Sequence, residues 1–374
     1  MPDLNNGRKT MACERLIYKT DPKAPFILGI LEGEGIGPEL TRCALEIVSA
    51  LKSKRQFNIE IQHGGLIGQD SESVCGKALS DEVIDFCRDI FSAQGAILAG
   101  PGAGRFVYDL RREFDLFCKL VPLKAFERPL GACRIKTDYL TGVDILLVRE
   151  NMSGIYMGEW EEIHDPEVGR KICLRTSYCE KEVERILKVA NRLAASRKKK
   201  LMVVIKDGGL PQLSELWRNC SEKIASSSDV AFTYANIDLA GYYFVQHAQE
   251  LDVVVGPNLF GDILADIGGA LMGSRGLTYS ANCSQSGAAV YQTNHGAAFD
   301  LVGTGRANPV GHIFALAMML RESYGLFDEA RLVEKAVEEV WRQGWRTDDL
   351  AEPGCRSVGT IKMTDLIVEA IMNG

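Results

Sequence analysis

The feature of this sequence that most constrains its fold is a series of short apolar segments separated by stretches with helical periodicity. The apolar segments are rich in Ile, Leu, Val and Ala and cover residues 26–31, 95–99, 144–148, 201–205 and 251–255. Amphipathic helical patterns cover residues 80–91, 181–196 and 212–226, and the chain has a largely helical pattern from about residue 309, most clearly over 329–343 and 360–372. Apolar strands that alternate with helices indicate an α/β fold whose strands are buried between helices.

The length of the chain, 374 residues, exceeds one ordinary core and suits two domains or lobes. Neither an internal repeat nor a low-complexity linker divides the sequence, so we expect the lobes to be interleaved along it. Residues 1–24 mix basic and acidic side chains, and we predict that they form a flexible N-terminal arm.

Charge and hydropathy argue against two classes of partner. The net charge of −7 argues against a nucleic-acid-binding protein, and the one dense basic run, residues 197–200, is interpreted as a solvated helix end. No apolar run reaches the roughly 18–20 residues of a membrane span, and the N-terminus has no signal-peptide pattern. Eleven cysteines without a CxxC pair suggest free thiols in a reducing compartment. We therefore expect a cytoplasmic protein.

A glycine-rich turn follows the first apolar segment. Gly33, Gly35 and Gly37 have a GxGxG spacing, which differs from GxGxxG because the third glycine comes one residue early. No acidic residue ends a second strand about 20 positions later, as a simple Rossmann unit requires. We interpret the turn as a structural strand-to-helix connection.

Two carboxylates suggest a metal site. In a helix, Asp262 and Asp266 stand at i and i+4 on one face, where like charges repel unless a cation neutralises them. Carboxylate oxygens suit Mg²⁺ or Mn²⁺, and Asp238 could add a third oxygen. The alternative is an acidic N-terminal helix face stabilised by the helix dipole, and the motif alone leaves both interpretations open.

Several motifs together resemble one enzyme family. They are residues 33–39 (GEGIGPE), 110–117 (LRREFDLF), 148–151 (VREN) with Tyr156, 258–266 (NLFGDILAD), 294–300 (NHGAAFD) and 305–309 (GRANP). In this order and at these separations they resemble the isocitrate and isopropylmalate dehydrogenase family of β-decarboxylating dehydrogenases. The resemblance covers nearly the whole chain after residue 25.

The resemblance implies a two-lobed α/β fold of the isocitrate/isopropylmalate dehydrogenase type, outside the Rossmann class, with an interlobe active-site cleft. We predict a large cofactor-binding domain formed by residues 25–116 plus 271–374. A small domain, residues 117–270, would carry the dimer interface and the metal and catalytic residues. The family works as a homodimer, so we expect a homodimer whose sites are shared between subunits.

The resemblance also assigns catalytic and metal-binding roles. Asp262 and Asp266 match metal ligands of one chain, whereas Asp238 and Lys206 match residues that serve the neighbouring subunit's site. Lys206 would remove the hydroxyl proton, and Tyr156 would protonate the enolate after CO₂ leaves. Hydride transfer from C2 requires that the hydroxyl proton also leaves, which is why a base is needed there.

Substrate and cofactor positions follow from the same resemblance. Arg111 and Arg149 match arginines that bind substrate carboxylates, a bidentate contact that lysine makes poorly. The positions that match the cofactor site are His295, Gly296, Asp300, Leu301 and Asn308. An acid at position 300 can accept hydrogen bonds from ribose hydroxyls and would repel a 2′-phosphate, so we predict NAD as the cofactor.

Three departures from the family pattern concern the substrate. Val121 stands where the family has a third carboxylate-binding arginine, and Gly208 replaces an asparagine. The loop at 100–109 is shorter than in isocitrate enzymes. In this loop Arg105 and Tyr108 could bind a distal anion such as a carboxylate or phosphonate. The alternative is that Arg105 faces solvent and Tyr108 only packs.

These observations predict an NAD- and metal-dependent enzyme that oxidises, and also decarboxylates, a 3-substituted malate-type 2-hydroxy acid. The departures favour a specialised paralogue over the housekeeping isocitrate or isopropylmalate enzymes. Two alternatives remain open. One is a dehydrogenase that releases no CO₂, because its substrate lacks the carboxylate that the missing arginine would bind. The other is a non-catalytic regulatory subunit of the same fold.

Overall fold

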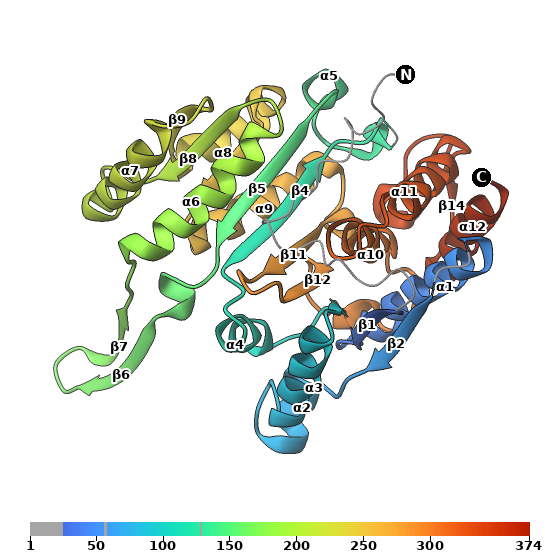
Figure 1. Ribbon diagram of the computed structural model, residues 1–374, viewed down its shortest axis with the longest axis horizontal. Helices are drawn as coiled ribbons and strands as arrows, with labels where there is room; N and C mark the ends of the chain where they lie inside the picture. Colours follow the sequence, from blue (N-terminus) through green and yellow to red (C-terminus); the bar gives the residue numbers. More distant parts are fainter. Residues whose placement is uncertain (1–24, 56–57, 128) are drawn as a thin grey trace.

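A ten-stranded mixed sheet forms the centre of the computed structural model, which describes residues 25–374 except 56, 57 and 128 (Figure 1). Its strand order is β2-β1-β3-β12-β11-β4-β5-β10-β8-β9. The strands are β1 Phe26–Leu31, β2 Ile59–His63, β3 Ala96–Ala99, β4 Cys118–Lys124, β5 Asp144–Glu150, β8 Lys200–Ile205, β9 Ala231–Asn236, β10 Val253–Gly256, β11 Tyr279–Cys283 and β12 Ala289–Thr293. The predicted N-terminal arm lies outside the described residues.

Two parallel regions of the sheet are joined by antiparallel strands. Strands β2, β1, β3 and β12 are parallel neighbours, as are β5, β10, β8 and β9. Strand β11 is antiparallel to both β12 and β4, and β4 is antiparallel to β5. All five apolar segments singled out in the sequence form strands of this sheet, which confirms the α/β prediction.

Helices cover the sheet. They are α1 Gly37–Arg55, α2 Gly68–Cys75, α3 Asp81–Ser92, α4 Phe106–Glu113, α5 Thr137–Leu140, α6 Glu180–Ala195, α7 Pro211–Ala225, α8 Ile237–Gln246, α9 Asn258–Met272, α10 Val310–Glu322, α11 Phe327–Arg342 and α12 Thr360–Asn373. Helix α10 is buried on all sides from Val310 to Leu320, because it packs between β11–β12 and the helices α1 and α11. Such burial explains why its sequence is apolar throughout rather than amphipathic.

A hairpin extends away from the body of the molecule (Figure 1). It consists of β6 Glu159–Asp165 and β7 Gly169–Arg175, which pair with each other and not with the central sheet. Its exposed apolar side chains are Trp160, Ile163, Val168, Ile172 and Leu174. A short parallel pair, β13 Trp345–Arg346 and β14 Arg356–Ser357, lies beside α11.

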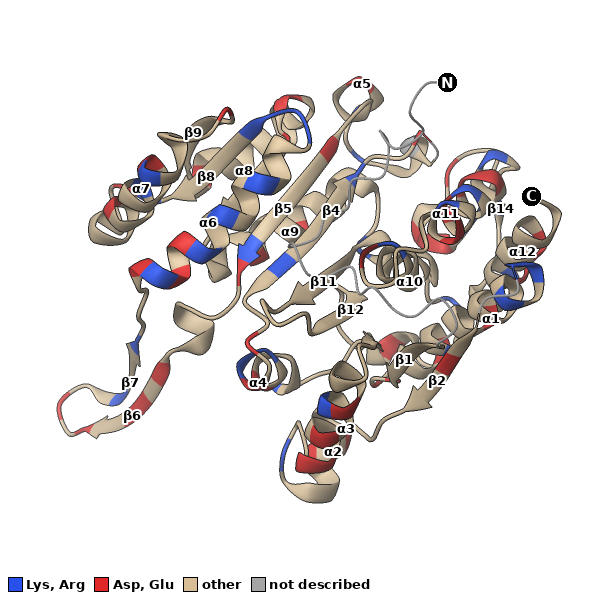
Figure 2. Cartoon of the chain, viewed as in Figure 1, with Lys and Arg blue, Asp and Glu red and all other residues tan. Residues whose placement is uncertain are grey.

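The basic run at 197–200 follows its prediction only in part, because Lys198, Lys199 and Lys200 are exposed whereas Arg197 is not. Arg197 is not solvated: its Nε donates to the buried carboxylate of Asp252 at 2.7 Å, and its Nη2 donates to the Asp144 carbonyl at 2.8 Å. The guanidinium therefore joins the end of α6 to the starts of β5 and β10. Along α6 itself, basic and acidic side chains are interspersed (Figure 2). Within the described chain, no helix is both long and apolar enough to cross a membrane.

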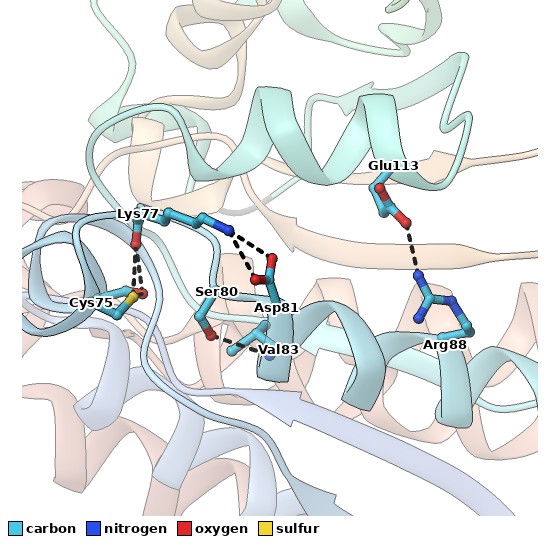
Figure 3. Close-up of polar contacts among 8 residues, drawn as sticks. Cys75, Lys77, Ser80, Asp81, Val83, Arg88 and Glu113 are labelled. Atoms are coloured by element: carbon cyan, nitrogen blue, oxygen red, sulfur yellow. Dashed lines mark hydrogen bonds and ion pairs between the residues drawn. The ribbon is translucent and has the colours of Figure 1, made fainter.

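Helix α4, which precedes the sheet's central strand β4, is fixed against α3. Ser80 caps α3 by accepting a hydrogen bond from the Val83 backbone N–H at 3.3 Å, and Lys77 pairs with Asp81 (Figure 3). Further along α3, Arg88 donates to Glu113 of α4 at 2.9 Å (Figure 3). These contacts hold the helix that carries Arg111.

Candidate active site

A buried arginine organises the first group of functional side chains. Arg149, near the carboxyl end of β5, is 2% exposed. Its Nε donates to Oδ1 of Asn258 at 2.9 Å, and its Nη1 donates to Oδ1 of Asp262. The other carboxylate oxygen of Asp262 accepts a hydrogen bond from the Tyr156 hydroxyl at 2.9 Å. The structure thus links three residues that the sequence placed in one site: Arg149, Tyr156 and Asp262.

A glycine permits this arrangement. Gly261 in α9 lies directly over Arg149, and a Cβ built on it would lie 2.9 Å from both Cβ and Cγ of that side chain. Real Cβ atoms do not approach so closely without a shift of the surrounding structure. Helix α9 can therefore pack on β5 at the distance that lets Asp262 meet Arg149 only because residue 261 has no side chain.

Asp266 lies one turn further along α9. Helix α9 begins at Asn258, four residues before Asp262, so neither aspartate is in its first turn. Because the dipole effect falls off within the first turn, the structure does not favour the helix-dipole interpretation of this pair. Asp266 forms an ion pair with Arg275 at 3.2 Å, and its side chain is about half exposed.

Arg111 lies beside this group with part of its hydrogen-bonding capacity unused. It is 3% exposed, and its Nε and Nη1 have no hydrogen-bond partner among the described residues. Burial, together with the charge of Arg149, lowers its pKa. Its guanidinium lies 5.3 Å from the ring centre of Tyr108, and that ring lies 5.5 Å from the ring of Tyr156. Two buried arginines and two tyrosines therefore converge at this position.

Arg105, in the 100–109 segment, is only partly exposed to solvent. It is half-buried, and its guanidinium lies 5.1 Å from the Tyr108 ring centre and 4.6 Å from that of Trp160 on the hairpin. Its Nη2 also donates to the Tyr156 carbonyl at 3.3 Å. Arg105 is therefore bound within the protein as well as partly exposed, and both Arg105 and Tyr108 lie next to Tyr156.

The protonation of Tyr156 and Asp262 follows from their contacts. Burial, together with the hydrogen bond to Asp262, raises the pKa of Tyr156 to about 12, so its hydroxyl remains protonated at neutral pH. Burial alone would raise the pKa of Asp262, but the charge of Arg149 and the Tyr156 hydrogen bond more than offset it and lower that pKa. The pair is thus a proton donor held against a carboxylate anion.

Lys206 and Asp238 form a second group. Lys206 follows β8, Asp238 lies in the first turn of α8, and their side chains form an ion pair at 2.8 Å. The hydrogen bond from Lys206 lowers the pKa of Asp238. Among the described residues, the carboxylates of Asp238, Asp262 and Asp266 do not form a group whose ligand atoms all lie within 4.8 Å of one another. One chain therefore does not bring the three predicted metal ligands together.

A different acidic cluster meets the geometric requirement for a metal. Within the described chain, one group of three His, Cys, Asp or Glu side chains has all its ligand atoms within 4.8 Å of one another. Its members are Glu180, Glu184 and Cys220. Lys223 forms ion pairs with both glutamates and offsets part of their charge. The cluster lies on α6 and α7, apart from the groups described above.

The predicted cofactor residues lie in the segment between β12 and α10, which includes the short helix Phe299–Leu301. Asp300 is exposed within the short helix Phe299–Leu301, and Leu301 is half-buried. A Cβ on Gly296 would meet no atom within 4 Å. His295 is partly exposed, and burial lowers its pKa. Asn308 is engaged internally: its Nδ2 donates to Asp349 at 3.0 Å, and its Oδ1 accepts from the Val310 backbone. The amide group of Asn308 is therefore hydrogen-bonded within the protein.

The glycine turn supports this loop. Gly35 has a φ of 59°, and a Cβ there would lie 2.0 Å from the carbonyl oxygen of Ala297. The Ile36 backbone N–H donates to that same oxygen at 2.9 Å. Gly33 has a φ of 81°, and a Cβ there would lie 2.3 Å from the carbonyl oxygen of Pro101. The turn is a strand-to-helix connection, as predicted, and it positions the loops at 100–104 and 295–297.

Comparisons with known proteins agree with this arrangement. A sequence profile of the isocitrate/isopropylmalate dehydrogenase family matches residues 27–367. A 3-isopropylmalate dehydrogenase from Carboxydothermus hydrogenoformans is 34% identical over 363 residues, which cover 94% of this chain and 96% of that protein. Another from Bacillus licheniformis is 36% identical over 87% of this chain and 90% of its own length. The chain belongs to the isocitrate/isopropylmalate dehydrogenase family.

A solved structure supports the same assignment. The crystal structure of isocitrate dehydrogenase from Methylococcus capsulatus matches this family member with a TM-score of 0.81 and 30% identity, over 93% of this chain and 99% of that one. The predicted family and fold are therefore confirmed. As a member of this family, the protein is an NAD-dependent decarboxylating dehydrogenase that uses Mg²⁺ or Mn²⁺.

One buried residue of this family member was missed by the sequence analysis. Lys119 in β4 is 5% exposed and stands opposite Arg149 in the β4–β5 ladder. Burial lowers its pKa well below the usual value, and the charges of Arg149 and Arg111 act in the same direction. The signal in the sequence was a lysine inside an otherwise apolar segment, CKLVPL, which is the kind of position where lysine is rarely buried.

Proposed function

We propose that this enzyme oxidises a 3-substituted malate-type 2-hydroxy acid at C2 and decarboxylates the product. The observation that carries the proposal is the convergence of buried Arg111 and Arg149 with the Tyr156–Asp262 hydrogen bond. Buried arginines with free N–H groups bind carboxylates, and a protonated tyrosine beside them can deliver a proton to a substrate carbon. The 3-isopropylmalate dehydrogenases among its relatives act on a compound of this class.

We assign the residues as follows. Arg111 and Arg149 bind the carboxylates and orient C2. Lys206 accepts the proton of the C2 hydroxyl at its Nζ when the amine is neutral, and the contact with Asp238 holds that Nζ in place. The Tyr156 hydroxyl donates its proton to C3 of the enolate that decarboxylation leaves. The raised pKa of Tyr156 is consistent with this role, because the hydroxyl still carries its proton when the enolate forms.

The acidic residues fit a divalent metal. Asp262 and Asp266 offer carboxylate oxygens from one helix face, and their side chains are 43% and 54% exposed, so they are accessible to an ion. Asp238 would complete the set from the second subunit. When bound, the metal supplies Lewis-acid polarisation of the substrate oxygens. A cation between Asp262 and Asp266 would also relieve their mutual repulsion.

The loop after β12 fits NAD. The carboxylate of Asp300 is exposed and can accept hydrogen bonds from ribose hydroxyls, with Leu301 beside it. His295 and the open backbone at Gly296 leave room for an adenosine group. Because the Asn308 side chain is bonded to Asp349, we assign the contact at this position to its backbone.

We infer that the protein is a homodimer whose sites are shared between subunits. Helices α8 and α9 pack together and expose Leu239, Tyr242, Val245 and Ile263, and the projecting hairpin exposes a further apolar set. Exposed apolar surface of this kind marks an interaction site. Asp238 is the second residue of α8, and Asp262 lies next to Ile263 on α9. Association through these helices would bring Lys206 and Asp238 of one copy to Asp262 of the other.

We propose that Arg105 and Tyr108 contact the distal group of the substrate. Both lie against Tyr156, and the Arg105 guanidinium contacts the rings of Tyr108 and Trp160. A guanidinium in contact with two rings is restricted in position, which suits a distal carboxylate or phosphonate better than an alkyl group.

Two further assignments remain proposals. We divide the chain into a large domain, residues 25–116 plus 271–374, and a small domain, residues 117–270. With these boundaries the central sheet would be divided between β11 and β4. We also place the protein in the cytoplasm, which is supported by the absence of disulfides among the described cysteines.

The test is NADH formation by the purified protein with NAD and Mn²⁺. The substrates are malate, tartrate, isocitrate, 3-isopropylmalate and a phosphonomethyl malate, with CO₂ measured in the same reactions. We expect turnover of a 3-substituted malate, with one CO₂ for each NADH. NADH without CO₂ would instead support a non-decarboxylating dehydrogenase. NAD binding without turnover of any member of the panel would support a regulatory subunit.

Two variants test the shared site. Lys206→Ala and Asp262→Asn should each abolish turnover. When the two are unfolded and refolded together, a hybrid dimer regains one intact site, so roughly a quarter of the parental activity should return. If both residues served the same chain's site, no activity would return, and the shared-site assignment would be rejected.

A further inference from the structure

Lys119 is a buried cation without a partner in the described chain. It is the second residue of β4, and no hydrogen bond or ion pair joins its ammonium group to another described residue. Lysine is rarely buried unless it is paired, because removing its charge from water is costly. A buried lysine without a partner therefore needs a compensating group, such as a bound ligand.

The β4–β5 ladder fixes the direction of this side chain. Lys119 pairs directly with Arg149, and directly opposed residues of an antiparallel pair project from the same face. Arg149 projects towards α9, where it packs under Gly261. Four residues further along the same face of β4, Leu123 packs under Gly268 of α9. Lys119 therefore projects between β4, β5 and α9, at the end of α9 that carries Asp262.

Val121 lies between these two positions on the same face. It is fully buried, and alternate residues of a strand share a face. The family resemblance placed a carboxylate-binding arginine at this position. A positive charge has thus been lost at position 121, while a lysine stands two residues away on the same face of the same strand.

The surroundings of Lys119 favour an anionic ligand. Arg111 and Arg149 are both buried near it, and the carboxylates that act on it most strongly are those of Asp262 and Asp266. Asp262 is already paired with Arg149, and Arg111 has two N–H groups without a partner. Three buried cations are costly to hold together unless a ligand supplies further negative charge.

We propose that Lys119 binds a carboxylate of the substrate in place of the arginine that position 121 lacks. Lys119 is thus a specificity-determining residue, and it forms one carboxylate-binding set with Arg111 and Arg149. The inference rests on the proposed function, since it takes the ligand to be a malate-type acid. It also implies that the substrate keeps both carboxylates of the malate unit, including the one that leaves as CO₂.

The experiment compares the full-length parent with Lys119→Met, which keeps the side chain's length and removes its charge. Lys124→Met is the matched control, because Lys124 ends the same strand with its side chain about half exposed, near Glu338. Calorimetric titrations use malate, 3-isopropylmalate and isocitrate in turn with Mg²⁺. NAD is left out so that binding is measured without turnover. The Tm of each ligand-free protein is recorded in parallel.

We expect Lys119→Met to weaken binding of the best of these three acids by about 10- to 100-fold, the loss of one charge-assisted hydrogen bond. Lys124→Met should bind like the parent. Ligand-free Lys119→Met should melt no lower than the parent, because the variant removes an uncompensated buried charge. A residue with only a structural role would give the reverse: a lower Tm and unchanged binding.

The outcomes separate this inference from the function on which it rests. Equal affinity in the parent and Lys119→Met overturns the role of Lys119, even if NADH forms normally. Binding that depends on Lys119 without any NADH formation overturns the dehydrogenase reaction and leaves the role of Lys119 supported. If the parent binds none of the three acids, both the substrate class and the role of Lys119 are overturned.

Discussion

Replacement of Gly261 by alanine offers a direct test of how α9 is packed on β5. The new methyl group would lie 2.9 Å from Cβ and Cγ and 3.2 Å from Cδ of Arg149. Arg149 cannot easily move away, because it is buried and its guanidinium is bonded to Asn258 and Asp262. Helix α9 must therefore shift outward.

A second glycine provides the control that makes the magnitude measurable. Gly241 lies inside α8, and a Cβ there would meet only a methyl group of Ile267, at an ordinary 3.5 Å. Each substitution gains about 1 kcal/mol of helix propensity, so this gain cancels when the two variants are compared. The remaining difference is the cost of overpacking at Gly261, about 1–3 kcal/mol.

The assay is urea unfolding of both variants at one protein concentration, because association affects apparent stability. Gly261→Ala should be less stable than Gly241→Ala by about 1–3 kcal/mol. It should also bind substrate more weakly, since Arg149 and Asp262 are displaced with the helix. Equal unfolding free energies for the two variants would refute the claim that position 261 requires glycine.

Three further variants test individual groups. Tyr156→Phe should lower kcat about 10²- to 10⁴-fold with little change in KM, as the loss of a general acid predicts, and an unchanged kcat would contradict this role. Asp300→Lys should raise KM for NAD and improve the use of NADP, because a 2′-phosphate is no longer repelled; steady-state kinetics with both cofactors decide. Burial raises the pKa of Glu150 to about 7. The contribution of Glu150 to the free energy of unfolding is therefore present below about pH 4 and is lost as pH rises through 7. The stability of the parent relative to Glu150→Gln should therefore fall by roughly 3 kcal/mol over this interval in unfolding experiments, and a constant difference would contradict the shifted pKa.

The parts of the fold that the sequence predicted are those with a strong local pattern. The strands β1, β3, β5, β8 and β10 are uninterrupted apolar segments, and α3, α6 and α7 have clear helical periodicity. Strand β4 was missed because Lys119 and Pro122 interrupt its apolar pattern, although it lies between two other strands. Strands β6 and β7 do not pack on a hydrophobic core. The alternation of side chains along these exposed strands therefore does not indicate a buried sheet.

The candidate site was predictable where a residue lies inside a recognisable motif. Arg149, Tyr156 and Asp262 fall in such motifs, and the structure joins them directly. Lys119 could not be assigned a role, because its importance depends on the register that places it opposite Arg149, and register is set by pairing between distant segments. The contact between Arg105 and Trp160 likewise joins residues from separate elements.

The junction between β4 and β11 has a mechanical consequence. The two parallel regions of the sheet are connected there by a ladder of only three residue pairs, and Lys119 opposite Asn282 is the middle one. If one half of the sheet bends against the other at the proposed domain boundary, the bend passes through this ladder. The position of the Lys119 ammonium is then coupled to the angle between the halves, so an anion that fixes this lysine would also restrain the bending of the enzyme.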